Sequence, residues 1–425
     1  MLLNVPSLEF MQFQNDSFFK DLTNCINVIR RDDALSTVTV FKSGIEDVIF
    51  KRLGMRVEIR LVNDPVPNAS FSIPPLDKNH IFIKALTDCA DNDYGKFISY
   101  FSDKKARIGL VDIDKIKVGG VFSTIPVHIT IHSGHFNEVF SDEEIASTIL
   151  HELGHSFSYF FYLLHSSLCS FVSAATASRV AGAKGDAERV IILENGYRIM
   201  GLDNVAIRSH LTQTPEQIDA SMQTLYIDST SNDLRSVTGY GMYEIRAAEQ
   251  LADWFAAKFG AALPSTTCQE KLYRTSRMIA LNNTFKSRTS IFSAMIYGAI
   301  YISMTIPFPK FFSEVFRDDT ISLYDKDDDR IKLLRQNLID TIKDVKLPDL
   351  ARVDMLKQID EIKTIENRVS RSVQREYGDI VKFLKQRLIK NYRNNSNTVE
   401  LQKTIEELLY NESYVLAAKF KGASK

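Results

Sequence analysis

Two histidines and a glutamate within five residues are the strongest chemical signal in this chain of 425 residues. His151, Glu152 and His155 form the pattern HExxH. On a helix the two histidines lie one turn apart on one face, so both imidazoles can reach one Zn²⁺ at about 2.0–2.1 Å. Glu152 is then placed to take a proton from a metal-bound water and to pass it to a leaving amine. The pattern therefore predicts a hydrolytic zinc centre.

The residues before the motif predict the helix that it requires. Ser141 is a good N-cap residue, and Glu144 completes a capping box with it. Acidic residues at Asp142 and the two positions after it complement the positive end of the helix dipole. An apolar stripe follows at helical spacing: Ile145, Ile149, Leu153 and Phe157. We therefore expect a helix that starts near Asp142 and carries the motif.

A catalytic zinc site needs a third protein ligand and an open position. A second helix is predicted within 243–260, where apolar residues recur at helical spacing before Gly260. Glu249 and Asp253 lie four apart on it, in an alanine-rich stretch where unpaired carboxylates are unfavourable. Glu249 is the expected third ligand, and Asp253 the expected acceptor for the free N–H of a ligand histidine. Three other acids remain as alternatives for the third ligand: Glu244, then Glu188 and Glu194.

The two motif segments together resemble a peptidase family. SDEEIASTILHELGH followed by EQLAD is similar to the gluzincins that include the prenyl-protein processing proteases and the HtpX-type heat-shock proteases. The resemblance implies Glu249 as third ligand and Asp253 as its supporting acid. It also implies that the strand PVHITIH, 126–132, is the sheet edge on which a substrate peptide pairs. The chain also resembles predicted peptidases of large tailed phages, and both resemblances cover only about 140–260.

One element of these relatives is missing. Membrane-type gluzincins carry a His-Pro element followed by an Arg-Ile pair, and here Arg330 and Ile331 stand without the His-Pro. By this resemblance Arg330 is expected to assist the substrate or the oxyanion. The residue that takes the place of the missing histidine as electrophilic partner is therefore not identified, and Tyr324 and Tyr240 are the candidates.

Four other histidines lie within fifteen residues of the predicted strand end or of the motif. His128, His132 and His135 flank the end of a predicted strand at 127–131 and either line the cleft or are ordinary polar groups at the strand end. His165 is too far along the motif helix to bind the same ion.

The surrounding elements predict an α+β fold. A mainly helical gluzincin-type domain would carry a small mixed sheet, with the 93 residues between His155 and Glu249 leaving room for a long insertion that forms a lid or a wall of the cleft. Helices are expected near 16–31 and 43–53, a strand at 55–62, β-structure within 105–136, and charged helices on either side of Pro348. We divide the chain into an N-terminal α/β region, a catalytic domain and a charged helical region: 1–104, 105–316 and 317–425.

Composition and the N-terminal sequence indicate which partners and which cellular location to expect. The net charge of −1 gives no reason to expect a nucleic-acid partner. The N-terminus lacks the features of a secretory signal, so a cytoplasmic location is expected, with association with a virion as the alternative. The cysteines show no CxxC spacing and are read as free thiols: Cys25, Cys89, Cys169 and Cys268.

The sequence thus predicts a zinc-dependent peptidase that acts on a peptide or protein substrate, with Zn²⁺ as cofactor. One alternative is a structural, virion-associated protein that retains the gluzincin fold with little activity and assembles through its C-terminal helices. Another is a membrane protease, because the stretches around 156–178 and 289–309 carry no charged residue. We expect buried helices there instead of membrane spans.

Overall fold

The computed structural model describes the chain in segments. They are residues 12–14, 16–31, 38–73, 109–202, 205, 207–238, 245–272, 327–343 and 347–388, without the side chains of 29, 31, 38–43, 237, 238, 245, 246, 327, 328 and 370–388. The chain divides into two compact units, Met1–Thr305 with Asp319–Glu366, and Ile306–Asp318 with Asn367–Lys425. All elements that build the candidate site belong to the first unit.

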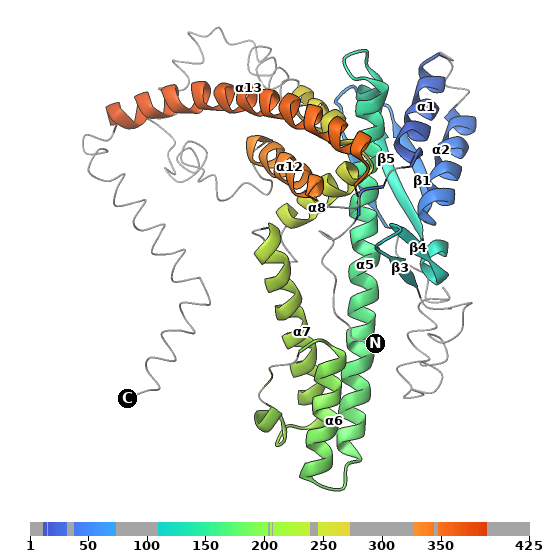
Figure 1. Ribbon diagram of the computed structural model, residues 1–425, viewed down its shortest axis with the longest axis vertical. Coiled ribbons are helices and arrows are strands. Elements are labelled where there is room, and N and C mark those ends of the chain that lie inside the picture. Colours follow the sequence, from blue (N-terminus) through green and yellow to red (C-terminus); the bar gives the residue numbers. More distant parts are fainter. Residues whose placement is uncertain are drawn as a thin grey trace, which may run out of the picture. The chain divides into compact units, whose positions relative to one another are not determined.

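A small mixed sheet stands beside a mostly helical body, as the α+β expectation requires (Figure 1). Its strand order is β1–β5–β2, with β1 at Arg56–Val62, β5 at Pro126–His132 and β2 at Ala69–Ser72. β5 runs parallel to β1 and antiparallel to β2. The apolar residues of β5 alternate along the strand and are buried, so they form one apolar face that specifies the register: Val127, Ile129 and Ile131.

The expectation that 126–132 forms the sheet edge is wrong. β5 has β1 on one side and β2 on the other, so its backbone groups are paired within the sheet. The outer side of β1 is partly closed by α2, because Glu46 accepts the backbone N–H of Ile59 at 2.8 Å. Among the described residues, β1 and β2 are the edge strands of this sheet, and neither pairs with a further strand on its outer side. Strand order depends on contacts far apart in sequence, which a local pattern does not contain.

Two helices pack beside the sheet at its β1 side. They are α1, Phe18–Arg31, and α2, Val38–Leu53, and both fall where periodicity predicted helices. Gly54 ends α2 with a φ of +69°, and a Cβ there would lie 2.1 Å from the carbonyl oxygen of Val118. That oxygen belongs to the short hairpin of β3, Leu110–Asp112, and β4, Lys117–Gly119. A glycine is therefore required by both the backbone angle and the close approach.

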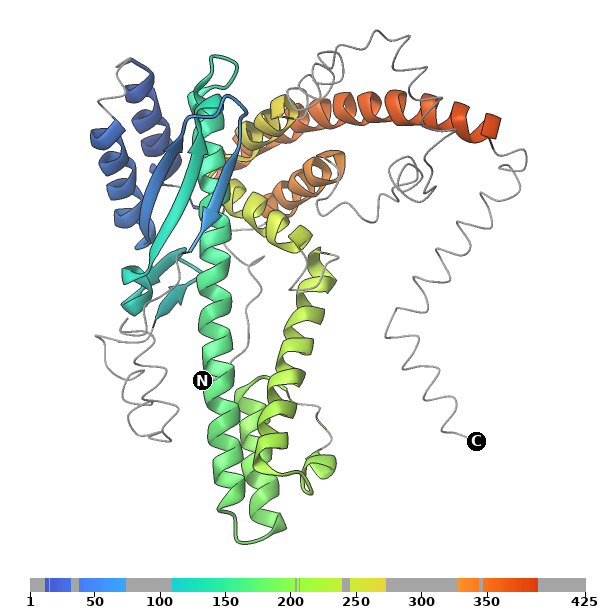
Figure 2. The ribbon, with the colours of Figure 1, turned by 180° about the vertical axis from the view of Figure 1, so that it is seen from behind.

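The motif helix α5 spans Asp142–Ala181, forty residues, and is the central element of the fold (Figure 2). It begins where the capping box predicted: the Ser141 hydroxyl accepts the N–H of Glu144, and the Glu144 carboxylate accepts the N–H of Ser141. Lys271, on a helical stretch at 262–272, donates to the Glu144 carboxylate at 2.7 Å. The start of α5 is thus held by local and by tertiary contacts.

The insertion between the two motif segments is a helical arm. α5 continues well past the motif, and α6, Asp186–Ile199, and α7, Pro215–Thr238, pack along its second half (Figures 1 and 2). Their core is formed by apolar side chains of all three helices, among them Cys169, Val180, Leu193, Tyr197, Ile218 and Met222. The insertion therefore has its own buried core.

α5 has the length and apolar composition of a membrane-crossing helix, yet 56% of its most apolar window is buried inside the protein. A core helix of a globular protein has the same properties. The exposed face of its second half carries small polar residues, Ser166, Ser170 and Ser178. The second uncharged stretch, around 289–309, lies outside the described residues.

Further helices follow the arm among the described residues. α8, Ile245–Lys258, ends before Gly260, which has the φ of +83° typical of a helix C-cap. α12, Asp327–Ile342, packs against α8, and α13, Asp349–Leu388, begins after Pro348. All three confirm helices that periodicity predicted. The division at 104 and 316 stays a prediction, as does assembly through the C-terminal helices.

Candidate metal centre

The motif histidines face one another across one turn of α5. The Nε2 atoms of His151 and His155 are 3.2 Å apart, and the ring centroids are 4.7 Å apart at an interplanar angle of 87°. Each side chain is 14% exposed, so the pair lies close to the protein surface and is partly accessible to solvent. This arrangement is what the spacing of four residues on a helix predicts.

Glu249 comes to this pair from α8. Its Oε2 lies 3.3 Å from Nε2 of His151, and its Oε1 lies 3.5 Å from Nε2 of His155. The ligand atoms of the three residues all lie within 4.8 Å of one another. The structure therefore brings together the three residues named as ligands from the sequence.

A glycine allows the two helices to approach this closely. A Cβ on Gly154 would lie 2.7 Å from Cα of Ala252 and 2.9 Å from Cβ of Phe255, both on α8. Ala252 lies between the two acids of α8, so the contact sets the depth at which Glu249 enters the site. Gly154 is thus required for the close approach of α5 and α8.

Asp253 supports His151 from behind. Its Oδ1 lies 2.9 Å from Nδ1 of His151, and it also accepts a hydrogen bond from Nε2 of Gln269 at 3.2 Å. A carboxylate at Nδ1 fixes the proton there and leaves the Nε2 lone pair directed at the cluster. The side chain of Asp253 is only 3% exposed, so this contact is shielded from water.

Arg330 reaches the same acids from the start of α12. Its Nε and Nη2 donate to the two oxygens of Asp253 at 3.0 and 2.9 Å, and Nη2 also lies 3.3 Å from Oε2 of Glu249. The sequence named Arg330 as a group that assists the substrate or the oxyanion. The structure brings it to the site, and these contacts are with the acids that surround His151.

Burial and charge give the groups of the cluster opposite pKa shifts. Burial alone would lower the pKa of His151, but hydrogen bonds with Asp253 and Glu249 outweigh it and raise the pKa to about 10. Burial also opposes the charged form of both acids, yet the pKa values of Glu249 and Asp253 are lowered, by the histidines and by Arg330 respectively. The acids are therefore ionised, and a positive charge is favoured among them.

Glu152 differs from the other two carboxylates. It is 7% exposed, and burial raises its pKa, while the nearby His151 and His155 act in the opposite direction. A raised pKa suits a carboxylate that must accept and then release a proton near neutral pH. Of the three acids at the site, Glu152 is thus the one whose protonated form is favoured by its surroundings.

The donor set fits a divalent cation. With its Nδ1 held by Asp253, His151 presents an Nε2 lone pair to the Nε2 of His155 and to an ionised carboxylate, all within 3.2–3.5 Å. Such electron-rich atoms meet at low cost only when a proton or a cation lies between them. Two imidazoles and one carboxylate with partial exposure match the protein ligands of a catalytic zinc site.

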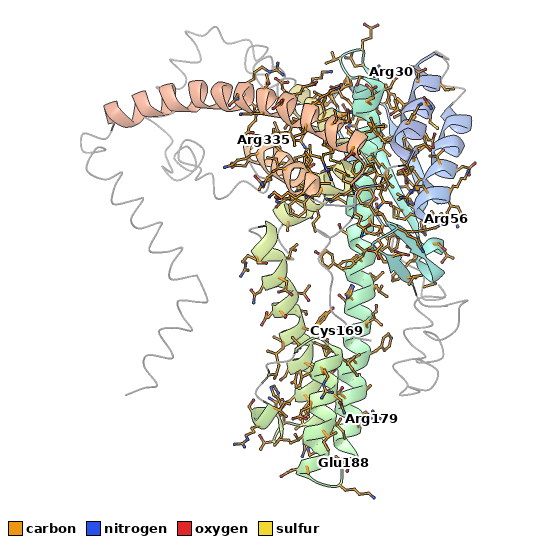
Figure 3. The ribbon with its side chains drawn as sticks, in the orientation of Figure 1. Arg30, Arg56, Cys169, Arg179, Glu188 and Arg335 are labelled. Atoms are coloured by element: carbon orange, nitrogen blue, oxygen red, sulfur yellow. The ribbon has the colours of Figure 1, made fainter. Side chains whose placement is uncertain are left out.

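The alternatives for the third ligand do not reach this cluster. Glu188 and Glu194 are exposed on α6, and Figure 3 shows Glu188 at the tip of the helical arm. Glu244 and the two tyrosines proposed as electrophilic partners, Tyr240 and Tyr324, lie outside the described residues.

The remaining histidines have other partners. His128 contacts Arg60 and Glu58 on β1, and His132 lies 3.4 Å from Asp64. His135 is buried against Phe140, and His165 lies 3.1 Å from the hydroxyl of Tyr226 on α7. All four are absent from the metal-binding group found among the described residues. For His165 this agrees with its distance along the helix.

Three residues beside the site were not singled out from the sequence. Gln269 donates to Asp253, Phe71 of β2 stacks on His155, and Tyr159 lies next to Phe71. Only Tyr159 left a usable signal, because it follows His155 by four residues and so shares the helix face of the motif. The other two depend on tertiary contacts.

No family model matches the chain, and comparison with curated proteins and with solved structures finds no match. The assignment of a function therefore depends on the geometry of the site.

Proposed function

We propose that this protein is a zinc-dependent peptidase. The single observation that supports this most strongly is the convergence of His151, His155 and Glu249 within 4.8 Å, from two helices about a hundred residues apart in the chain. If the HExxH sequence had arisen by chance, there would be no reason for an acid from a second helix to meet its two histidines. The ligand set, a buried glutamate next to the first histidine and an acid at Nδ1 supply the metal ligands, the proton acceptor and the supporting acid that a hydrolytic zinc centre needs.

Each residue of the site has a separate role in the proposed reaction. His151, His155 and Glu249 would hold the zinc ion, which when bound lowers the pKa of a coordinated water and polarises the scissile carbonyl. Glu152 takes the proton of the attacking water and delivers it to the amine that leaves. Asp253 keeps the proton of His151 on Nδ1, and Arg330 keeps Asp253 ionised and in place.

β2 offers a place for the substrate backbone. The N–H of His132 donates to the carbonyl of Asn68 at 2.9 Å, and the register pairs Ser70 with Thr130. Backbone groups alternate in an antiparallel pair, so those of Ala69 and Phe71 point away from β5. β2 also packs against α5, which carries the motif. An extended peptide would add to this side of β2, in place of the strand that the resemblance had indicated.

Metal analysis is the first test. The purified protein is expected to hold about one zinc per chain, and Glu249→Ala is expected to lose most of it, since one of three ligands is removed. Glu194→Ala is the matched control. That acid is exposed on α6, which packs against the second half of α5, away from the turn that carries the motif. Equal zinc in all three proteins would contradict the ligand set.

Hydrolysis of unfolded protein substrates is the second test. Glu152→Gln should keep the zinc and lose activity by at least about a hundredfold, because the proton acceptor is gone. Glu143→Gln, at an exposed position of the same helix, is the control and should cleave like the wild type. A wild type that binds zinc stoichiometrically but cleaves nothing would favour the alternative of a structural protein that retains the metal centre.

A further inference from the structure

An aromatic pair stands beside the metal ligands. The rings of Phe71 and His155 are nearly parallel, with centroids 6.1 Å apart and an interplanar angle of 19°. The ring of Tyr159 follows, 6.4 Å from that of Phe71. Phe71 comes from β2, the strand on which we propose that a substrate peptide pairs, and Tyr159 comes from α5, the motif helix. The pair therefore connects these two elements. We call Phe71 and Tyr159 the aromatic wall.

The aromatic wall is partly open to solvent at Tyr159. Tyr159 is 38% exposed, although it lies next to the rings of Phe71 and Phe160. Burial raises the pKa of its hydroxyl, so the side chain is neutral at physiological pH. A partly exposed neutral aromatic surface gains most from contact with another apolar or aromatic group.

The register on β2 directs a substrate side chain to this surface. Phe71 pairs with Ile129, and the two share the apolar face of the sheet on which α5 packs. A strand added outside β2 would have the same alternation, so its residue opposite Phe71 would point to that face too. That side chain would lie against Phe71, within reach of Tyr159 and next to His155.

We infer that the aromatic wall makes this site selective for peptides that place an aromatic or large aliphatic side chain beside the scissile bond. The inference rests on the proposed function for its setting, but it concerns a surface that a ligand can test without turnover. A ring in contact with the wall is expected to improve affinity by about tenfold over a methyl group.

Two small zinc-binding probes isolate the side chain. N-acetyl-phenylalanine hydroxamate and N-acetyl-alanine hydroxamate bind zinc through the same group and differ only by a phenyl ring. Calorimetry on the zinc-loaded full chain should show about tenfold tighter binding of the phenylalanine probe. Tyr159→Ala should reduce this ratio by about threefold or more, and Tyr159→Phe should keep it. Phe50→Ala, which truncates another exposed aromatic residue on α2, should leave the ratio unchanged.

The outcomes separate this inference from the proposed function. Equal binding of the two probes, or no binding of either, overturns the aromatic wall as a selective surface, even if the protein cleaves peptides. A ratio that survives in Tyr159→Ala also overturns it. A clear ratio that depends on Tyr159 supports the wall, and a wild type that nevertheless cleaves no peptide would then contradict the peptidase proposal alone.

Discussion

The guanidinium of Arg330 holds the carboxylate of Asp253 through two hydrogen bonds, 3.0 Å from Nε to Oδ2 and 2.9 Å from Nη2 to Oδ1. Asp253 in turn holds Nδ1 of His151 at 2.9 Å. Three helices far apart in the chain, α12, α8 and α5, are thereby joined in one line of contacts that ends at a metal ligand. A helix from the charged C-terminal part thus supplies a residue that positions the site.

We expect Arg330→Gln to weaken zinc binding by about tenfold to a hundredfold. The side chain of Asp253 is 3% exposed, and without the arginine it would be held less firmly in the orientation that supports His151. Arg330→Lys should be nearly as harmful, because a lysine cannot bind both carboxylate oxygens in parallel. Zinc affinity is measured by competition with a chromophoric chelator.

Arg335→Gln is the control for this experiment. Arg335, labelled in Figure 3, is on the same helix and pairs with Glu366 at 2.7 Å, away from Asp253. It should leave zinc affinity unchanged. If Arg330→Gln binds zinc like the wild type but turns substrate over more slowly, Arg330 acts on the substrate, as the sequence resemblance implied, and the positioning role is wrong.

Gly154→Ala tests the close approach of α5 and α8. The added methyl would lie 2.7 Å from Cα of Ala252 and 3.0 Å from its carbonyl oxygen, so backbone must move. We expect a loss of about 1–3 kcal/mol in the free energy of unfolding, together with weaker zinc binding as Glu249 is displaced. Both are measured on one preparation, by urea denaturation and by chelator competition.

Gly44→Ala is the matched substitution elsewhere. Gly44 lies within α2, and nothing would meet its Cβ within 4 Å. Alanine should therefore stabilise the protein there by up to about 1 kcal/mol through its higher helix propensity. A Gly154→Ala protein as stable as the wild type, with unaltered zinc affinity, would show that the helices can separate without cost.

The helix start at Ser141 gives a third prediction. Ser141→Ala removes the hydroxyl that accepts the N–H of Glu144, which should cost about 1 kcal/mol of stability. Zinc stoichiometry should not change, since the motif lies more than two turns further along α5. Ser166→Ala, at an exposed position within the same helix, should instead be neutral or slightly stabilising. Equal effects of the two substitutions in thermal unfolding would contradict the capping role.

The local parts of this site were predictable from sequence, because the residues of each part lie within a few turns of a single helix. The spacing of His151 and His155 fixes their common face, and Ser141 with Glu144 fixes where that helix begins. The acid pair on α8 was predictable for the same reason. These inferences use only the helical period and the chemistry of caps and ligands.

The parts that depend on tertiary contacts were not predictable. The place of β5 in the middle of the sheet depends on β2, whose four residues carry only a weak strand pattern. The stacking of Phe71 on His155 depends on the same strand. Arg330 was found through a resemblance, but its contact with Asp253 follows from how α12 packs on α8. No period in the sequence contains that information.

His135 gives the fourth prediction, a pH dependence. It is 1% exposed, and burial, with a smaller contribution from His132, lowers its pKa from 6.5 to about 4. Between these values the unfolded chain binds a proton that the folded chain does not. Stability from this residue is therefore complete above pH 6.5 and is lost as the pH falls toward 4.

The expected loss between pH 7 and pH 5 is about 2 kcal/mol in the free energy of unfolding. His135→Gln, which cannot titrate, should show a dependence on pH that is weaker by about this amount. His132→Gln should keep most of it, because the greater part of the shift comes from the burial of His135. Urea denaturation at the two pH values, with a chelator present so that zinc does not contribute, measures the slopes. Parallel slopes for the wild type and His135→Gln would show that His135 binds its proton equally well in the folded and the unfolded protein, which contradicts the lowered pKa.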